Sequence, residues 1–258
     1  MNRLEEMVKE ACDGLEDTNP DLILEEANKN LYDGVSEEDA RTSLVMTSRT
    51  LVEQEPNYTY VTARILLDNI RTEALTYLGM QKQATQKEME SLYPEALRNF
   101  LAKGVENEIL NPELLEMDVE KLGQAIVSAR DNDFTYLGLQ TLYDRYFIHD
   151  TEVRYELPQV FFMRVSMGLA LREDQREERA IEFYNLLSSF DYMSSTPTLF
   201  NSGTKHSQLS SCYLTTVPDD LHGIYGAIQD NAMLSKWAGG LGNDWTPVRG
   251  LGSQKKGT

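Results

Sequence analysis

The sequence is poor in the residues that most often bind metals or cross-link chains. Its 258 residues include two cysteines, Cys12 and Cys212, and three isolated histidines, His149, His206 and His222. Two cysteines exclude a disulfide framework, and no Cys/His pair has the spacing of a zinc site. No apolar run reaches membrane-spanning length, and the charged start of the chain is unlike a signal peptide. We therefore expect a cytoplasmic protein with no membrane partner and no metal of its own.

Positive charge is also scarce. The chain has 42 acidic residues against 24 lysines and arginines, a formal net charge of -18. Residues 1–128 hold 26 acidic and 12 basic side chains, and the remainder holds 16 and 12. Such a surface repels nucleic acid, so we expect no DNA or RNA partner. The acidic half is typical of solvated helix faces. A nucleotide site would need helix N-termini and a few basic side chains to offset this negative charge locally.

What the chain does have is helical periodicity. Apolar residues at helical spacing predict four helices in the first eighty residues, the last over 57–78. Pro20 suits a first helical position, Gly34 suits a helix end, and Ser36 suits an N-cap with an acid three residues on. Helices joined by such short loops pack as a small bundle.

The middle of the chain continues this pattern with one interruption. We predict helices over 88–110, 114–129 and 160–171, and a further helix capped by Asp174. The segment 141–148 (TLYDRYFI) is aromatic and β-branched enough to predict a strand or hairpin edge.

The amino-acid composition changes from residue 189 onward. Ser, Thr, Gly and Pro crowd the stretch 189–211, which predicts a loop. A strand over 212–217, a helix over 221–236 and a glycine-rich turn at 239–245 leading into another short strand follow. A strand, a helix and a strand in this order indicate an α/β layer.

Two positions in this last part are candidates for chemistry. Cys212 begins the predicted strand, where either a reactive thiol or an inert, half-buried one fits. Asp219 and Asp220 precede the predicted helix, where they act either as N-caps or as acids that accept hydrogen bonds from ribose hydroxyls. The residues alone leave both choices open.

The roles of the glycines and basic residues that follow are also left open. The turn around Gly240 does not match the dinucleotide fingerprint, although it permits a ligand to approach the backbone closely. Arg249, Lys255 and Lys256 form a small basic cluster, which suits an anion site or a solvated loop.

These same segments resemble a known family. The catalytic barrel of the class I ribonucleotide reductase large (catalytic, alpha) subunit begins with segments similar to SSTPTLFNSGT, QLSSCYLTT, DDLHGIYGAI and LSKWAGGLGNDWTPVRGLGS. Upstream, NLYDGVSEEDARTSL and EQEPNYTYVTARILL resemble the helical part of the ATP-cone, the activity-regulating domain of the family. The resemblance implies an α/β chain with a partial ATP-cone over 1–80, a helical region over 81–188, and the first strands of a ten-stranded barrel over 189–258.

The resemblance also implies an activity, the radical reduction of ribonucleotides to deoxyribonucleotides. In the family a thiyl radical removes the ribose 3′ hydrogen, and a cysteine pair supplies protons and reducing equivalents for loss of the 2′ hydroxyl. A thiol suits this task because the resulting disulfide can be reduced again. Cys212 matches one member of that pair.

Other residues carry over from the resemblance one by one. Thr198 and Ser211 match positions that hold the phosphate or ribose of the substrate, and Gly240 matches a backbone position against the substrate. The deoxynucleotide effector site, which sets substrate specificity, is matched by Asp219, Leu221, Arg249 and Lys256.

The resemblance implies partners as well. In the family the thiyl cysteine, the second redox cysteine and the C-terminal cysteine pair lie beyond the segment matched here, and strands of the cone lie before it. We therefore expect no activity from this chain alone, and the C-terminal portion of the catalytic subunit as a second polypeptide. We also expect a radical-generating small subunit carrying the radical cofactor, a thioredoxin- or glutaredoxin-type reductant, and ATP and deoxynucleotide effectors. The alternatives are a non-catalytic nucleotide-binding regulatory fragment of a reductase, or a portion of a longer chain.

Overall fold

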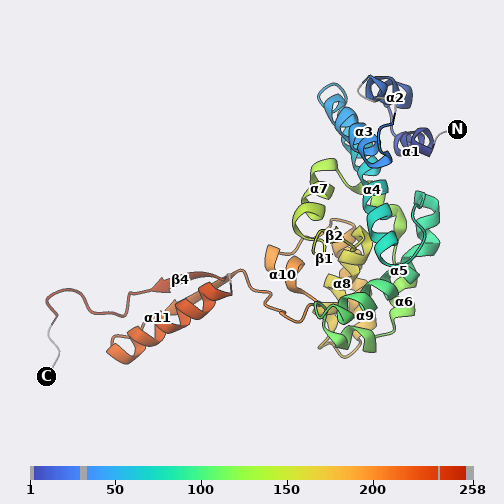
Figure 1. Cartoon of the computed structure of the whole chain (residues 1–258). Coiled ribbons are helices and arrows are strands. Elements are labelled where there is room, and N and C mark those ends of the chain that lie inside the picture. The colour runs from blue at the N-terminus through green and yellow to red at the C-terminus, as the bar shows by residue number, and fades with distance from the viewer. Residues whose placement is uncertain (1–2, 30–33, 238, 254–258) are drawn as a thin grey trace. The chain divides into compact units, whose positions relative to one another are not determined.

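The computed structural model describes residues 3–29, 34–237 and 239–253, and Figure 1 follows its helices and strands along the chain. The chain divides into two compact units, which we call unit 1 and unit 2. Unit 1 comprises Met1–Met193 with Gly203–Lys205, and unit 2 comprises Ser194–Ser202 with His206–Thr258. Within the described ranges, no helix is both long and apolar enough to cross a membrane.

Unit 1 begins with the four predicted helices: α1 (Arg3–Cys12), α2 (Pro20–Asn28), α3 (Glu37–Leu51) and α4 (Tyr58–Tyr77). The helix α4 is central, because α1 and α3 both pack against it (Figure 1). The residues predicted to start α2 and α3 do so. Pro20 opens α2, and the Ser36 side chain accepts a hydrogen bond from the backbone N–H of Asp39 at the start of α3.

The rest of unit 1 is built around a buried helix. Its helices are α5 (Gln86–Glu106), α6 (Val119–Gln124), α7 (Tyr136–Arg145), α8 (Pro158–Ala170) and α9 (Arg176–Ser188). Almost every residue of α8 is buried, because α5 and α9 pack on it. The predicted helix over 160–171 is thus confirmed, but Asp174 does not cap the next one. The residue before α9 is Gln175, which makes no side-chain cap.

The charged side chain within α8, Arg164, forms a buried ion pair. The Arg164 guanidinium and the Glu156 carboxylate are both inaccessible to solvent, and two hydrogen bonds of 2.9 and 3.0 Å join them. Such bidentate geometry offsets the cost of removing both charges from water.

The continuous helix predicted over 114–129 is wrong. The structure has the 3-10 helix η1 (Pro112–Glu116), then α6, then the 3-10 helix η2 (Ser128–Asp133). The Asn111 side chain accepts from the backbone N–H of Glu113, and Asp118 accepts from that of Lys121. These side chains compete for backbone donors and restart the chain as short helices.

The strand or hairpin edge predicted over 141–148 is also wrong, because most of this segment lies in α7. Thr135 caps α7 by accepting from the Gly138 N–H, and Leu139 and Leu142 are buried at helical spacing. Packing of α7 against α4 thus overrides the β-propensity of the aromatic residues. The neighbouring sheet is a short antiparallel pair, β1 (His149–Asp150) and β2 (Val153–Arg154).

Unit 2 consists of α10 (Thr196–Asn201), β3 (Cys212–Thr216), α11 (Leu221–Lys236) and β4 (Gly240–Asp244). The strands β3 and β4 are parallel, with Cys212 opposite Gly240 and Thr216 opposite Asp244. The Asp220 side chain caps α11 by accepting from the Gly223 N–H. The predicted order of strand, helix and strand is confirmed, and Figure 1 shows α11 alongside β4.

Two predictions in this region need correction. The stretch 189–211 is not all loop, because Pro197 in its first turn helps α10 to form. The glycine-rich segment 239–245 is not a turn, because β4 begins at Gly240. The N–H of Gly240 donates to the carbonyl of Ser211 at 3.0 Å, and this bond starts the parallel ladder.

Candidate functional site

Cys212 lies at the amino end of β3 with its thiol exposed. Its neighbour across the sheet is Gly240, and a Cβ added there would lie 3.6 Å from the Cys212 sulfur and 3.2 Å from the carbonyl oxygen of Ser211. The hydroxyl of Ser211 donates to the Cys212 Sγ at 3.5 Å. Glycine therefore leaves the backbone beside the thiol open to a ligand.

Thr198 is linked to this cluster by a hydrogen bond to the chain segment that precedes β3. The Thr198 Oγ1 donates to the carbonyl of Leu209 at 3.2 Å, and the Asn201 amide donates to that of Gln208 at 2.7 Å. These bonds tie α10 to the segment leading into β3. The structure thus brings together Ser211, Cys212 and Gly240, and holds Thr198 to their approach.

Two of the residues predicted for the effector site, Asp219 and Arg249, meet at the other end of the strands. The Nε of Arg249 donates to the Asp219 carboxylate at 2.8 Å, and Nη2 donates to the Asp219 carbonyl at 3.3 Å. Each side chain keeps about a third of its surface exposed, at 35% for Arg249 and 34% for Asp219. The pair fixes the loop after β4 to the loop after β3, at the carboxyl end where α/β proteins commonly bind ligands.

The other two residues predicted for the effector site are Leu221 and Lys256. Leu221 is the first residue of α11 and is 74% exposed, so its side chain is available for contact. Lys256 lies outside the described residues. At the same end, hydrogen bonds from Thr246 hold the pKa of the Asp244 carboxyl below its usual range, so this carboxylate is charged at neutral pH.

The two candidate sites therefore occupy opposite ends of one parallel strand pair. Cys212 begins β3, and Asp219 follows its end at Thr216. At a rise of about 3.3 Å per residue, the four steps of β3 separate its ends by roughly 13 Å. The roles of the individual residues remain predictions.

Some polar groups were not identified from the sequence. The side-chain oxygens of Asn231 on α11 and Asn243 on β4 are buried without a hydrogen-bond partner in the described part of unit 2. No local spacing marks these residues, because their burial depends on how α11 covers β4. Among the described residues, no cluster of His, Cys, Asp and Glu has the arrangement of a metal site.

Comparison with known proteins agrees with the arrangement of these segments. Residues 132–207 match the family model described as "Ribonucleotide reductase, all-alpha domain", and residues 210–258 match "Ribonucleotide reductase, barrel domain". Ribonucleoside-diphosphate reductase subunit alpha of Chlamydia muridarum is 48% identical over 94% of this chain and 23% of its own length. The corresponding subunit of Helicobacter pylori is 32% identical over 98% of this chain and 31% of its own length. The large subunit of Danio rerio is 32% identical over all of this chain and 32% of its own length.

A helical region that leads into a parallel β-α-β unit, matched in that order by the two models, defines a reductase large-subunit chain. The chain belongs to the ribonucleotide reductase family and corresponds to an N-terminal portion of its large, alpha subunit. It spans between about a quarter and a third of the length of these curated relatives.

Proposed function

We propose that this chain serves as the N-terminal portion of a ribonucleoside-diphosphate reductase catalytic subunit and supplies one redox cysteine, Cys212. The observation that carries this proposal is the exposed thiol beside the open backbone of Gly240, inside the segment that matches the barrel domain. The relatives of similar sequence are named as ribonucleoside-diphosphate reductases.

The proposed chemistry needs a second thiol. Two thiols give up two electrons and two protons, the ribose loses its 2′ hydroxyl as water and gains hydrogen, and a disulfide remains. The other cysteine of this chain, Cys12, is buried in α1 and belongs to unit 1. The second redox cysteine and the radical cysteine therefore belong to the remaining portion of the subunit, which we propose as the principal partner.

The surface of unit 2 supports the same conclusion. Leu214 lies in the middle of β3 with 90% of its surface exposed, and Trp245 after β4 is 49% exposed. Large apolar side chains in and next to a sheet normally lie in a buried layer. Further strands and helices of a barrel would cover them.

The remaining assignments follow from the two ends of the strand pair. We propose that Thr198, Ser211 and the Gly240 backbone contact the substrate, and that Asp219, Leu221, Arg249 and Lys256 contribute to the deoxynucleotide effector site. The helices α1–α4 correspond in this proposal to the helical part of an ATP-cone. A radical-bearing small subunit and a dithiol reductant complete the assembly.

The test is reconstitution. The chain is co-expressed with the portion of the Chlamydia muridarum alpha subunit that follows the matched segment. Reduction of a ribonucleoside diphosphate is then assayed with a dithiol and a radical-bearing small subunit. We expect activity only when both polypeptides are present, and we expect Cys212→Ser to abolish it while the matched variant Cys12→Ser retains it.

Two outcomes would contradict the proposal. Activity retained by Cys212→Ser would remove the redox role of this thiol. Co-purification of the two polypeptides without turnover, together with nucleotide binding by this chain, would favour a regulatory fragment instead.

A further inference from the structure

A contact between two aromatic rings joins the segments that lead into the Cys212–Gly240 pair. The centroids of the His206 and Trp237 rings lie 5.8 Å apart, with 35° between the ring planes, a separation within the range of favourable aromatic pairs. His206 stands six positions before Cys212, and Trp237 stands three positions before Gly240. Both rings belong to unit 2. The chain is therefore bridged just ahead of the first residue pair of the parallel ladder.

Trp237 is held in place by the end of α11. Its N–H donates to the carbonyl of Leu234 at 3.1 Å, and the N–H of Gly239 donates to the same carbonyl at 3.0 Å. A Cβ added at Gly239 would lie 2.9 Å from Cε2 of Tyr213, so the backbone there passes close against β3. The Lys236 ammonium lies 5.4 Å from the centroid of the Trp237 ring and is attracted to its face. These contacts fix the Trp237 ring relative to the start of β4.

The segment that carries His206 is anchored elsewhere by α10. Residues 206–211 form neither a helix nor a strand in the structure. The carbonyls of Gln208 and Leu209 accept hydrogen bonds of 2.7 and 3.2 Å from side chains of α10. These two bonds hold the segment to α10 but do not restrain it toward β4. The ring contact with Trp237 supplies a restraint in that direction.

The first pair of the ladder is the part of the sheet that most needs such a restraint. In the described part of unit 2 the sheet has two strands, and a sheet of two strands is marginally stable without further support. The ends of such an element open most readily. The bond of 3.0 Å from the Gly240 N–H to the Ser211 carbonyl keeps Gly240 beside Cys212. Opening of this bond would let the thiol move away from the Gly240 backbone.

We propose that His206 and Trp237 form a clasp that holds the start of β3 to the start of β4 and so positions the Cys212 thiol beside the Gly240 backbone. Both are positioning residues, because they act through the strand ends rather than on the reacting atoms. The proposal rests on the redox role proposed for Cys212, and it adds the contact that sets the geometry of the thiol.

The test measures amide hydrogen exchange in the full chain by nuclear magnetic resonance. The Gly240 N–H reports on the end of the ladder next to the clasp. The Val217 N–H, which donates to the Asp244 carbonyl at 2.9 Å, reports on the opposite end. We expect His206→Ala to speed exchange of the Gly240 amide roughly two- to tenfold, the contribution of an aromatic pair, and to leave exchange of the Val217 amide unchanged.

Two further variants separate the ring contact from other effects. His222→Ala removes an exposed histidine of α11 in the same unit, and it should leave both amides unchanged. His206→Phe keeps a ring at the clasp and should retain the slow exchange of the wild type. Exchange as fast in His206→Phe as in His206→Ala would overturn the proposal, and so would equal exchange rates in His206→Ala and His222→Ala.

The reconstituted assembly tests the consequence for turnover. We expect His206→Ala to lower kcat by a similar factor and His206→Phe to restore it, because a displaced thiol weakens interactions made in the transition state. Faster exchange of the Gly240 amide with an unchanged kcat would contradict the positioning role. Turnover that does not need Cys212 would instead refute the proposed function, and the exchange rates alone would then decide whether the clasp exists.

Discussion

Arg71 and Asp131 form a buried ion pair that joins the helical bundle of α1–α4 to the rest of unit 1. Their charged atoms lie 3.0 Å apart, with side-chain exposures of 4% and 0%. Asp131 also accepts from the Tyr93 hydroxyl at 2.7 Å and from the Gln159 amide at 2.9 Å. One carboxylate therefore connects α4, α5, η2 and α8.

Removal of this carboxylate should be strongly destabilising. We expect Asp131→Ala to lower the free energy of unfolding by about 3–5 kcal/mol, because Arg71 would be left as an uncompensated buried charge. Urea denaturation followed by circular dichroism measures the change. The matched control is Asp133→Ala, an exposed acid of the same 3-10 helix, which should change stability by less than about 0.5 kcal/mol. Equal effects of the two variants would refute the role of the network.

The two thiols should differ sharply in reactivity. Cys212 is exposed, whereas Cys12 is buried and its burial raises the pKa of the thiol. Since the thiolate is the nucleophile, iodoacetamide at pH 8 should modify Cys212 and leave Cys12 unmodified in the folded chain. Mass spectrometry of peptides gives the ratio. Both should react in denaturant, and modification of Cys12 under native conditions would contradict the packing of α1.

Stability should fall at high pH because of a buried tyrosine. Burial, with a further contribution from the charge of Asp131, raises the pKa of Tyr93 well above 10. In the unfolded chain the phenol ionises near pH 10, so the unfolded state alone releases this proton as the pH rises. The contribution is complete below pH 10 and is lost above it, by about 0.8 kcal/mol at pH 10.5.

Tyr93→Phe isolates this contribution. Urea midpoints at pH 8 and pH 10.5 should shift less in the variant than in the wild type. Some dependence should remain, since burial also raises the pKa of Tyr155 and Tyr184. Identical shifts in the two proteins would show that Tyr93 does not contribute.

The open backbone beside Cys212 should matter for turnover. In Gly240→Ala the new Cβ would lie 3.2 Å from the Ser211 carbonyl oxygen, closer than most such contacts. We expect the reconstituted assembly to lose about tenfold or more in kcat/KM, a cost of about 1.4 kcal/mol. Gly250→Ala is the matched control, since no atom lies within 4 Å of its added Cβ. Equal activities would argue against a substrate at this backbone.

The parts of the fold predicted from the sequence are those with local causes. The helices α1–α4 and α8 and the β3-α11-β4 order follow from hydrophobic spacing and from caps such as Ser36 and Asp220. The strand predicted over 141–148 failed because the contact of α7 with α4, distant in sequence, outweighs local propensity.

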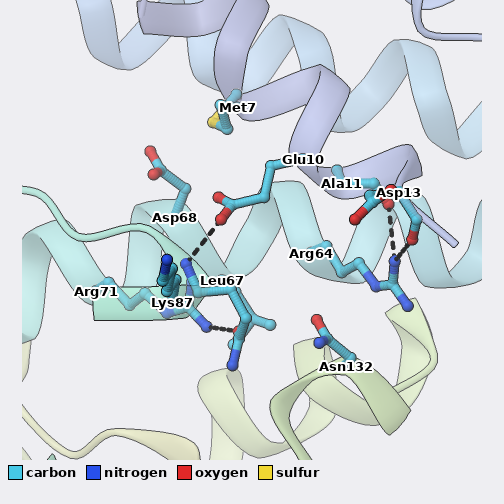
Figure 2. Close-up of a pocket in the computed structure, with 11 residues that line it drawn as sticks. Met7, Glu10, Ala11, Asp13, Arg64, Leu67, Asp68, Arg71, Lys87 and Asn132 are labelled. Atoms are coloured by element: carbon cyan, nitrogen blue, oxygen red, sulfur yellow. Dashed lines mark hydrogen bonds between the residues drawn. The ribbon is translucent and has the colours of Figure 1, made fainter. Parts of the chain in front are cut away.

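The same distinction applies to the sites. The resemblance pointed to Cys212, Gly240, Asp219 and Arg249, and the structure adds that Gly240 lies opposite Cys212 and that Arg249 pairs with Asp219. A pocket of about 290 Å³ in unit 1 was not predicted, because its lining comes from α1, α4, α5 and η2 (Figure 2).

The pairing of β3 with β4 also restricts how this gene can change. Side chains alternate between the two faces of a strand, so a one-residue shift reverses every side chain along it. Insertion of a single residue between 212 and 219 would turn the Cys212 thiol to the opposite face or pull Asp219 out of reach of Arg249. We expect this stretch to tolerate substitutions but to keep a constant length.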